Sequence, residues 1–239
     1  MTELLYLHDP YMRDFSATVT AIDAEGHAVA LDSTAFYPGG GGQQPDAGHL
    51  QSEAARYRVS KTRKQGDTVW HVVEGENLPE IGTTVQAGLD WDRRYGAMRT
   101  HTAMHILCGV IWRDYGVSVT GGNMDILGGR MDFEFDNLTP DTIAEIEQKI
   151  NAEVAQARPV SARILPRDEA FAIPDLIRTK VNLLPEHITE VRVVEIEGLD
   201  LQADGGTHVR NTEEVGTIRI TKYKSKGGAN KRLYIELDA

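Results

Sequence analysis

Two short motifs, far apart in the sequence, each place two possible metal ligands four residues apart. The first is His101-Thr-Ala-Met-His105, and the second is Asp204-Gly-Gly-Thr-His208. On a helix, residues i and i+4 lie on the same face, so His101 and His105 would point their imidazoles in one direction. The two glycines of the second motif allow a tight turn that could bring both of its ligands to one ion. We therefore expect a fold that brings the two motifs together.

A histidine pair at helical spacing has a simpler explanation when it is taken alone. Two such histidines can also be solvated or hydrogen-bonded without any metal. The second motif favours the metal, because the two motifs together supply three imidazoles and one carboxylate, a set suited to zinc. We predict His101, His105, Asp204 and His208 as metal ligands and as the catalytic centre.

The composition limits the environment and the partners of the chain. Its net charge of -11 opposes indiscriminate binding to nucleic acid, so a polyanionic partner would need a local basic patch. Cys108 is the single cysteine, which excludes an internal disulfide, and its apolar surroundings favour an inert buried thiol. The first ten residues meet acid and proline too soon for a signal peptide, and no apolar run approaches spanning length. We expect a cytoplasmic protein with no membrane partner.

The residue pattern changes near residue 90 and predicts two domains. Before that point, alternating or β-branched runs predict strands at residues 17–22, 28–32, 57–61, 68–73 and 83–90. Many short strands without long helices favour a small barrel or sandwich. Beyond Asp90 the spacing becomes helical, and further strands follow. We therefore predict an α+β protein, with a β domain over residues 1–90 and an α+β domain over residues 91–239.

The second domain is predicted to contain two helices and four strands. The first helix follows Trp91 and stops at Gly116, and the second begins at Thr139-Pro140, an N-cap followed by proline. Apolar residues recur at helical spacing in both helices. The strands are predicted at residues 160–165, 191–196, 216–222 and 233–237.

Several catalytic signatures are missing from the sequence. No glutamate follows His101, so the zinc-peptidase motif H-E-x-x-H is absent, and no G-x-S-x-G elbow occurs. The glycine run at residues 39–42 lacks the Gly-Lys-Ser/Thr of a phosphate-binding loop. Metal-assisted hydrolysis is the chemistry that the remaining residues favour.

Several segments together resemble the free-standing alanyl-tRNA editing proteins of the AlaX type, in their medium-length form. These segments are residues 36–48, 98–107, 200–212 and 215–220, together with the hairpin near Gly227-Gly228. The resemblance implies a translation-factor-like N-terminal barrel and an α+β editing domain shared with alanyl- and threonyl-tRNA synthetases. It also implies hydrolysis, in trans, of the ester that joins serine or glycine to mischarged tRNA(Ala).

Asp204 stands where this family has a cysteine ligand. Aspartate can bind zinc, but it is a harder ligand than thiolate and weakens the preference for soft metals. Asp204 could ligate directly, act as general base to a bound water beside three histidines, or mark a weakened or repurposed site. We favour direct or water-mediated ligation of Zn²⁺, because a dication attracts any nearby carboxylate.

The remaining site residues are predicted to handle the ester, the serine hydroxyl and the tRNA. Backbone amides near Gly205-Gly206 could receive the developing oxyanion. Thr102, unless it bonds its own backbone, is a candidate partner of the serine hydroxyl, as are Gln43 and Gln44. The glycine-rich loop could alternatively be only a tight turn. We predict substrate-binding roles for Gly40, Gly41, Gly42, Gln43 and Thr207, and tRNA-binding roles for Arg93, Arg94, Lys222, Lys224, Lys226 and Arg232.

The sequence leaves two other functions open. The chain could be a metal-dependent esterase or amidase that acts on small aminoacyl compounds. It could instead be a non-catalytic tRNA-binding relative whose site has decayed at Asp204. The charged segments could also be ordinary solvated surfaces.

Overall fold

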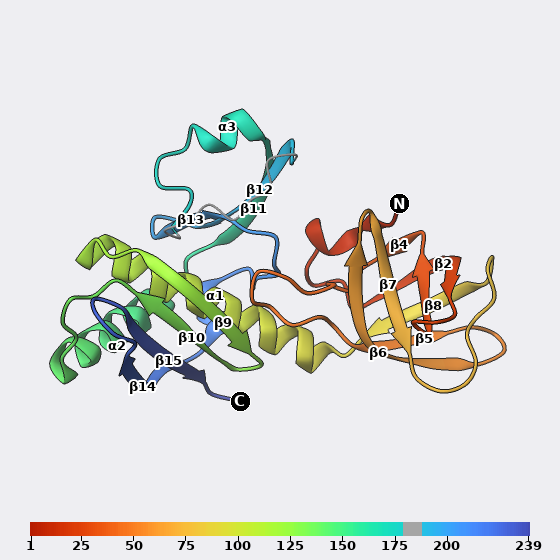
Figure 1. Cartoon of the computed structure of the whole chain (residues 1–239), viewed down its shortest axis with the longest axis horizontal. Coiled ribbons are helices and arrows are strands. Elements are labelled where there is room, and N and C mark those ends of the chain that lie inside the picture. Colours follow the sequence, from red (N-terminus) through yellow and green to blue (C-terminus); the bar gives the residue numbers. More distant parts are fainter. Residues whose placement is uncertain (179–187) are drawn as a thin grey trace. The chain divides into compact units, whose positions relative to one another are not determined.

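The structure is a computed structural model, and it describes residues 1–178 and 188–239. The chain divides into two compact units, Met1–Gly96 and Ala97–Ala239. The long helix α1 (Trp91–Tyr115) begins in the first unit and continues into the second. Figure 1 shows the course of the chain through these elements.

The first unit is a closed antiparallel barrel, so the predicted barrel is confirmed. Around the barrel the strands follow the order β2 (Asp14–Asp23), β3 (Ala28–Leu31), β7 (Thr68–Val73), β6 (Arg56–Gln65), β5 (Gly48–Gln51) and β8 (Thr84–Leu89). A short 3₁₀ turn η1 (Leu5–Leu7) and the parallel pair β1 (Glu3–Leu4) and β4 (Ser33–Thr34) precede or flank these strands. Alternate side chains of β2, including Phe15, Ala17 and Val19, are buried inside.

Strand β5 was not predicted, because it is short and begins with a glycine. Gly48 pairs with Leu89, and a Cβ at Gly48 would lie 2.2 Å from the carbonyl oxygen of Gly88. Only glycine lets β5 and β8 approach this closely. The residue that hides the strand from pattern recognition therefore allows the barrel to close.

His71 is buried within the barrel and is held in its neutral form. Its Nδ1 lies 3.2 Å from the carbonyl oxygen of Val29, which only accepts, so Nδ1 carries the proton. Its Nε2 then accepts from the Thr34 hydroxyl at 2.9 Å. Burial lowers the pKa of His71 from 6.5 to about 4.

This buried histidine should make stability depend on pH. Because the unfolded chain binds the His71 proton more readily between pH 6.5 and 4, stability is present above that window and falls as the pH drops through it. We expect a loss of about 3 kcal/mol from this residue alone. Urea unfolding of the wild type and of His71→Gln at pH 7, 5.5 and 4 measures it. Parallel pH profiles of the two proteins would contradict the prediction.

The second unit is an α+β arrangement, as predicted. Its larger sheet has the strand order β14 (Ile218–Ser225), β15 (Lys231–Leu237), β10 (Gly128–Phe133) and β9 (Val119–Asp125). The smaller sheet contains β11 (Val160–Pro166), β12 (Glu190–Ile196) and β13 (Asp200–Ala203). Helix α2 (Pro140–Val154), the short helix α3 (Arg167–Phe171) and the 3₁₀ turn η2 (Thr212–Val215) complete the unit.

The two predicted helices are confirmed, but helix α1 is buried more extensively than its predicted apolar stripe implies. The Thr139 side chain accepts from the amide of Thr142 at 3.1 Å, as the predicted N-cap requires. Helix α1 ends one residue before Gly116, which has a φ of +65°. Its middle is buried all round rather than on one stripe, since Met104 lies against Gly122 and Gly129 of the sheet while Gly109 faces Leu199 and Asp200.

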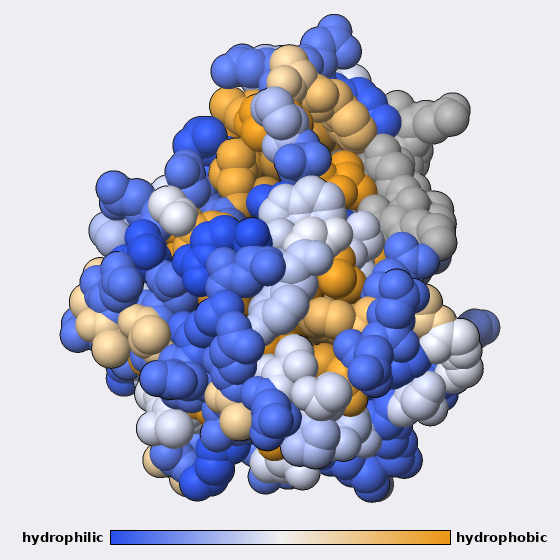
Figure 2. All heavy atoms as spheres, turned by 90° about the vertical axis from the view of Figure 1, so that its left-hand side faces the viewer, coloured by the Kyte–Doolittle hydropathy of each residue, from blue (hydrophilic) through white to orange (hydrophobic). Residues whose placement is uncertain are grey.

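Hydrophobic side chains are partly exposed on the smaller sheet and α3. Ile164 of β11 and Phe171 of α3 are among the exposed large apolar residues. In the view of Figure 2, hydrophobic residues gather in the upper part, over the smaller sheet and α3, and mainly hydrophilic residues lie below them. In the part of the chain that the structure describes, no helix combines the length and the apolarity needed to cross a membrane.

Candidate metal centre

Four predicted ligands come together in the second unit. Helix α1 carries His101 and His105 one turn apart, while Asp204 and His208 lie on the segment that follows β13. One ligand atom from each of the four side chains lies within 4.8 Å of the others. The two sequence motifs therefore form one cluster, which could hold a metal ion.

The three imidazoles face one another closely. The His208 ring centroid lies 4.2 Å from that of His101 and 4.8 Å from that of His105. The Asp204 carboxylate bridges the group, with Oδ2 at 2.9 Å from His208 Nε2 and Oδ1 at 3.5 Å from His101 Nε2. Three nitrogen donors and one carboxylate at this spacing fit a divalent transition metal.

Each histidine ring also has a hydrogen-bond partner outside the four candidate ligands. His208 Nδ1 lies 3.2 Å from Thr102 Oγ1, and His105 Nδ1 lies 3.0 Å from Asp200 Oδ2. His101 hydrogen-bonds to the backbone of Thr207. Such partners fix the tautomer and the orientation of metal-binding histidines. This support is a second feature of the cluster that fits a metal.

The Thr102 hydroxyl lies behind His208. Besides its contact with that ring, it accepts from the amide of Val209 at 3.3 Å. The Thr102 hydroxyl therefore does not bond only to its own helix, which was the other predicted possibility. This placement favours an orienting role for Thr102 over recognition of a substrate hydroxyl.

Burial and charge favour the protonation states that ligands need. Burial lowers the pKa of His101 to about 4 and lowers the pKa of His208 well below its usual value. Burial acts to raise the pKa of Asp204, but the charge of His101 and the hydrogen bond from His208 outweigh it and lower that pKa well below normal. His101 and His208 are therefore neutral and Asp204 is ionised near neutral pH, as metal binding requires.

His105 differs from the other two imidazoles. Burial acts to lower its pKa, but the hydrogen bond and charge of Asp200 outweigh burial and raise the pKa above its usual value. Asp200 was not among the predicted site residues. The helical glycine Gly109, one turn after His105, is the sequence signal that could have pointed to an element crossing α1 there.

Arg192 of β12 holds the turn that carries Asp204, and it too was missed. Its Nη1 donates to the carbonyl oxygens of Asp204 at 3.0 Å and Gly206 at 2.9 Å. The amide of Gly206 donates to Asp204 Oδ2 at 2.8 Å. That amide can therefore serve the predicted oxyanion role only after the Asp204 carboxylate has turned away from it.

The glycine-rich loop lies in the first unit and forms a tight turn. Gly39, Gly40, Gly41 and Gly42 all have positive φ angles, the largest being +133° at Gly40. The amide of Gly40 donates to the carbonyl oxygen of Gln43 at 3.1 Å, and the Gln43 amide returns a bond of 2.9 Å. The predicted substrate contacts of Gly40, Gly41, Gly42 and Gln43, and that of buried Thr207, stay predictions.

Two arginines of the predicted tRNA contact set are engaged within the first unit. Arg94 is fully buried, and it pairs with Asp46 and donates to the carbonyl oxygen of Pro10 at 2.8 Å. Arg93 donates to the carbonyl oxygen of Pro45 and to Gln44 Oε1, both at 3.0 Å. The burial of Arg94 argues against its predicted contact with phosphate, because its guanidinium is bonded to groups of the first unit.

Loss of the Arg94 guanidinium should destabilise the first unit. Arg94→Met leaves the Asp46 carboxylate buried without its charged partner. We expect a loss of about 3–5 kcal/mol in the free energy of unfolding. Urea unfolding measures this loss, and Arg58→Met is the control because the Arg58–Asp90 pair is half-exposed, with N and O 3.9 Å apart. A loss no larger than that of the control would contradict an interior role.

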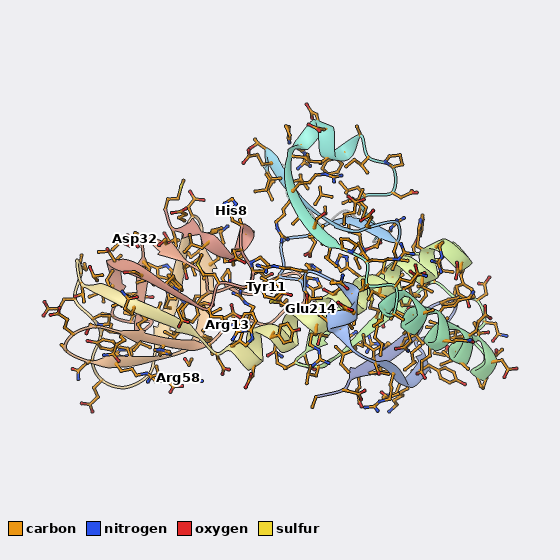
Figure 3. The ribbon with its side chains drawn as sticks, turned by 180° about the vertical axis from the view of Figure 1, so that it is seen from behind. His8, Tyr11, Arg13, Asp32, Arg58 and Glu214 are labelled. Carbon is orange, nitrogen blue, oxygen red and sulfur yellow. The ribbon has the colours of Figure 1, made fainter. Side chains whose placement is uncertain are left out.

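An aromatic and basic cluster marks the start of α1. The Arg13 guanidinium carbon lies 4.1 Å from the Trp91 ring centroid, and Tyr11 contacts both Trp91 and Tyr95. Figure 3 shows Tyr11 and Arg13 beside the beginning of this helix. These contacts anchor the helix start to the segment that precedes β2.

The other predicted tRNA contacts lie on the larger sheet. A hollow of about 530 Å³ is lined by Lys222, Arg232, Tyr234 and Arg130, among others. Lys222 and Lys224 each place Nζ 5.9 Å from the Tyr234 ring centroid. Arg232 forms a two-pronged pair with Asp132, at 2.6 and 2.7 Å, so part of its charge is already balanced.

Both units match parts of known synthetases. Residues 8–93 match the family model of tRNA synthetases class II (A), and residues 191–234 match that of the threonyl and alanyl tRNA synthetase second additional domain. The alanine–tRNA ligase of Pyrobaculum arsenaticum is 40% identical over 228 residues, which cover 92% of this chain and 25% of the ligase. Fold and site thus define a protein related to a part of class II aminoacyl-tRNA synthetases.

Two relatives match along their whole length. The alanyl-tRNA editing protein AlaX-M of Methanosarcina barkeri is 40% identical over 242 residues, which cover 99% of both chains. The protein of the same name from Saccharolobus solfataricus is 40% identical over 237 residues, or 98% of both chains. This chain therefore belongs to the AlaX-M family of alanyl-tRNA editing proteins, and the resemblance noted in its sequence is confirmed.

Proposed function

We propose that the protein deacylates tRNA(Ala) that has been mischarged with serine or glycine, acting in trans by metal-assisted ester hydrolysis. The observation that carries this proposal is the convergence of His101, His105, Asp204 and His208 within 4.8 Å. Family membership supplies the substrate class, because the full-length relatives are named alanyl-tRNA editing proteins.

The four clustered side chains would hold Zn²⁺. Neutral imidazoles and an ionised carboxylate are the forms that ligate, and the partners behind the rings keep their orientation fixed. When bound, the ion would supply Lewis-acid activation of water and of the ester carbonyl at neutral pH. Asp204 is the hard ligand of the set, so the site should also accept metals that favour oxygen.

The protein's own groups would position the ester around this centre. Thr102 and Asp200 orient the His208 and His105 rings, and Arg192 fixes the turn that carries Asp204. The amides of Gly205 and Gly206 are proposed to receive the developing oxyanion once Asp204 has turned away. Burial of the cluster would strengthen these interactions by limiting access of water.

Selection of serine over alanine requires a partner for one hydroxyl group. A site that hydrogen-bonds a substrate hydroxyl can reject the analogue without it by roughly 10⁴–10⁵. Thr207 and the loop residues Gly40, Gly41, Gly42 and Gln43 are proposed for substrate binding. The family resemblance supports these roles, and Thr207 also lies next to the candidate ligand His208 in the sequence.

The tRNA backbone is proposed to contact Lys222, Lys224 and Arg232 of the larger sheet and Lys226, which follows β14. Arg93, on α1 in the first unit, is proposed as a further contact. Lysines whose ammonium groups lie on an exposed strand suit phosphate contacts, which position a nucleic acid without reading its sequence. Because the chain carries a net charge of -11, we expect modest binding, and the lysine and arginine contacts with phosphate should make it weaken as salt is raised.

The direct test compares hydrolysis of seryl-, glycyl- and alanyl-tRNA(Ala) with hydrolysis of a small serine ester. Rapid loss of serine or glycine from tRNA, with alanine spared, supports the proposal. Hydrolysis of the small ester but not of tRNA would identify a small-molecule esterase. Binding of tRNA without hydrolysis, in a metal-free protein, would identify a non-catalytic tRNA-binding relative.

A further inference from the structure

We propose that Asp200 is a positioning residue of the metal centre, which fixes the His105 ring from behind and raises the affinity of the centre for a divalent cation. The inference rests on the metal centre of the proposed function and not on its tRNA substrate. It is carried by three observations: the contact with His105, the burial of the carboxylate and the shape of α1 where Asp200 approaches it.

The contact directs the His105 ring toward the other ligands. Asp200 Oδ2 lies 3.0 Å from His105 Nδ1, a distance at which the ring N–H donates to the carboxylate. With Nδ1 occupied in this way, the lone pair of the neutral ring is on Nε2. Of the partners behind the three ligand rings, Thr102, Asp200 and the Thr207 backbone, Asp200 is the charged one.

Burial of this carboxylate is energetically unfavourable unless its charge is compensated. The Asp200 side chain is 0% exposed, and Gln202 Nε2 donates to the same oxygen, Oδ2, at 2.7 Å. Oδ1 accepts no hydrogen bond from the residues described and lies 3.5 Å from Arg178 Nε. A buried carboxylate with hydrogen bonds on only one oxygen is expected to reduce stability. A dication on the opposite side of the His105 ring would compensate this charge.

Helix α1 contains a glycine where Asp200 approaches it. A Cβ at Gly109 would lie 3.0 Å from Asp200 Cβ and 3.0 Å from both the side chain and the carbonyl oxygen of Leu199. Glycine in the middle of a helix is less favourable than alanine. At Gly109 it allows the β12–β13 turn to lie against the helix, one turn beyond His105. This close approach is what lets the short Asp200 side chain reach the ring.

A simpler explanation is that Asp200 forms an interior ion pair with Arg178, with no influence on the metal. The two explanations differ in one measurable quantity. An interior ion pair predicts a loss of stability with unchanged metal affinity, whereas a positioning role predicts weaker binding of the metal by a folded protein.

The test is zinc and cobalt affinity of the full chain, measured by competition with a chromophoric chelator. Asp200→Asn keeps the size and an acceptor but removes the charge, and we expect affinity to fall about 10–100-fold. Gly109→Ala should weaken binding in the same direction by displacing the Asp200 backbone. Glu153→Gln is the matched control, because Glu153 is a buried acid of the same unit that pairs with Arg113 and Arg158.

A second measurement on the wild type does not depend on any variant folding. Nitrogen-15 NMR of the imidazoles should show that His105 keeps its Nδ1 proton when zinc is added and that its Nε2 resonance shifts. Wild-type affinity in folded Asp200→Asn, or zinc bound through His105 Nδ1, would overturn the proposal. A wild type that binds zinc but leaves both seryl- and glycyl-tRNA(Ala) intact would refute the proposed function and leave the role of Asp200 standing.

Discussion

Replacement of His208 by alanine is expected to lower the rate of seryl-tRNA(Ala) deacylation by on the order of a thousandfold, equivalent to about 4 kcal/mol of transition-state stabilisation. His208 contacts every other member of the cluster, through stacking on His101, edge contact with His105 and the 2.9 Å contact with Asp204. Its loss removes one ligand and also the partner that fixes the Asp204 carboxylate.

The measurement is single-turnover deacylation at saturating enzyme, with metal content determined on the same samples. His8→Ala serves as the control, because His8 is an exposed histidine of the first unit (Figure 3). Circular dichroism checks that both variants remain folded. Retention of more than a tenth of wild-type activity by folded, metal-free His208→Ala would remove the cluster from the mechanism.

Changes at Asp204 should separate its three interpretations. Asp204→Asn removes the ionised ligand, and we expect zinc affinity to fall by about a hundredfold or more, since loss of an outer-shell partner already lowers it 10–100-fold. Activity should fall in parallel. Zinc binding that survives while activity is lost would instead make Asp204 a general base that does not ligate the ion.

Asp204→Cys is the companion experiment. A thiolate is the softer ligand, so the variant should prefer zinc and cadmium over manganese more strongly than the wild type does. It also loses both carboxylate oxygens, including Oδ2, which now contacts both His208 Nε2 and the Gly206 amide. We therefore expect zinc occupancy to rise without a matching gain in rate. A parallel rise in both would mark Asp204 as a weakened ancestral site.

The pairing of the four candidate ligands within each motif was predictable, because local geometry determines it. Helical spacing places His101 and His105 on one face, and the Gly-Gly turn does the same for Asp204 and His208. Asp200 and Arg192 were not predictable in this way. Their roles depend on how β12 and β13 pair and on how closely their turn approaches α1, which no local pattern encodes.

The pattern predicted both main helices and a barrel or sandwich, between which the family resemblance chose the barrel, but it did not predict some strands or the burial of one arginine. Strands β9 and β10 contain Gly121, Gly122, Gly128 and Gly129, which interrupt the apolar alternation that identifies a strand. Two of them, Gly122 and Gly129, make room for helix α1, because a Cβ there would lie 3.3 Å from Met104 Cε and 3.0 Å from Met104 Sδ, respectively. The sequence led us to predict a tRNA contact for Arg94, because a sequence shows its charge but not its burial against Asp46.

The most direct test of the metal centre is X-ray absorption spectroscopy of the zinc-reconstituted protein, combined with elemental analysis. We expect about one zinc ion per chain, with a first shell of nitrogen and oxygen and the multiple-scattering signature of three imidazoles. A protein that remains without zinc under these conditions, or a spectrum that lacks imidazole scattering, would contradict the account.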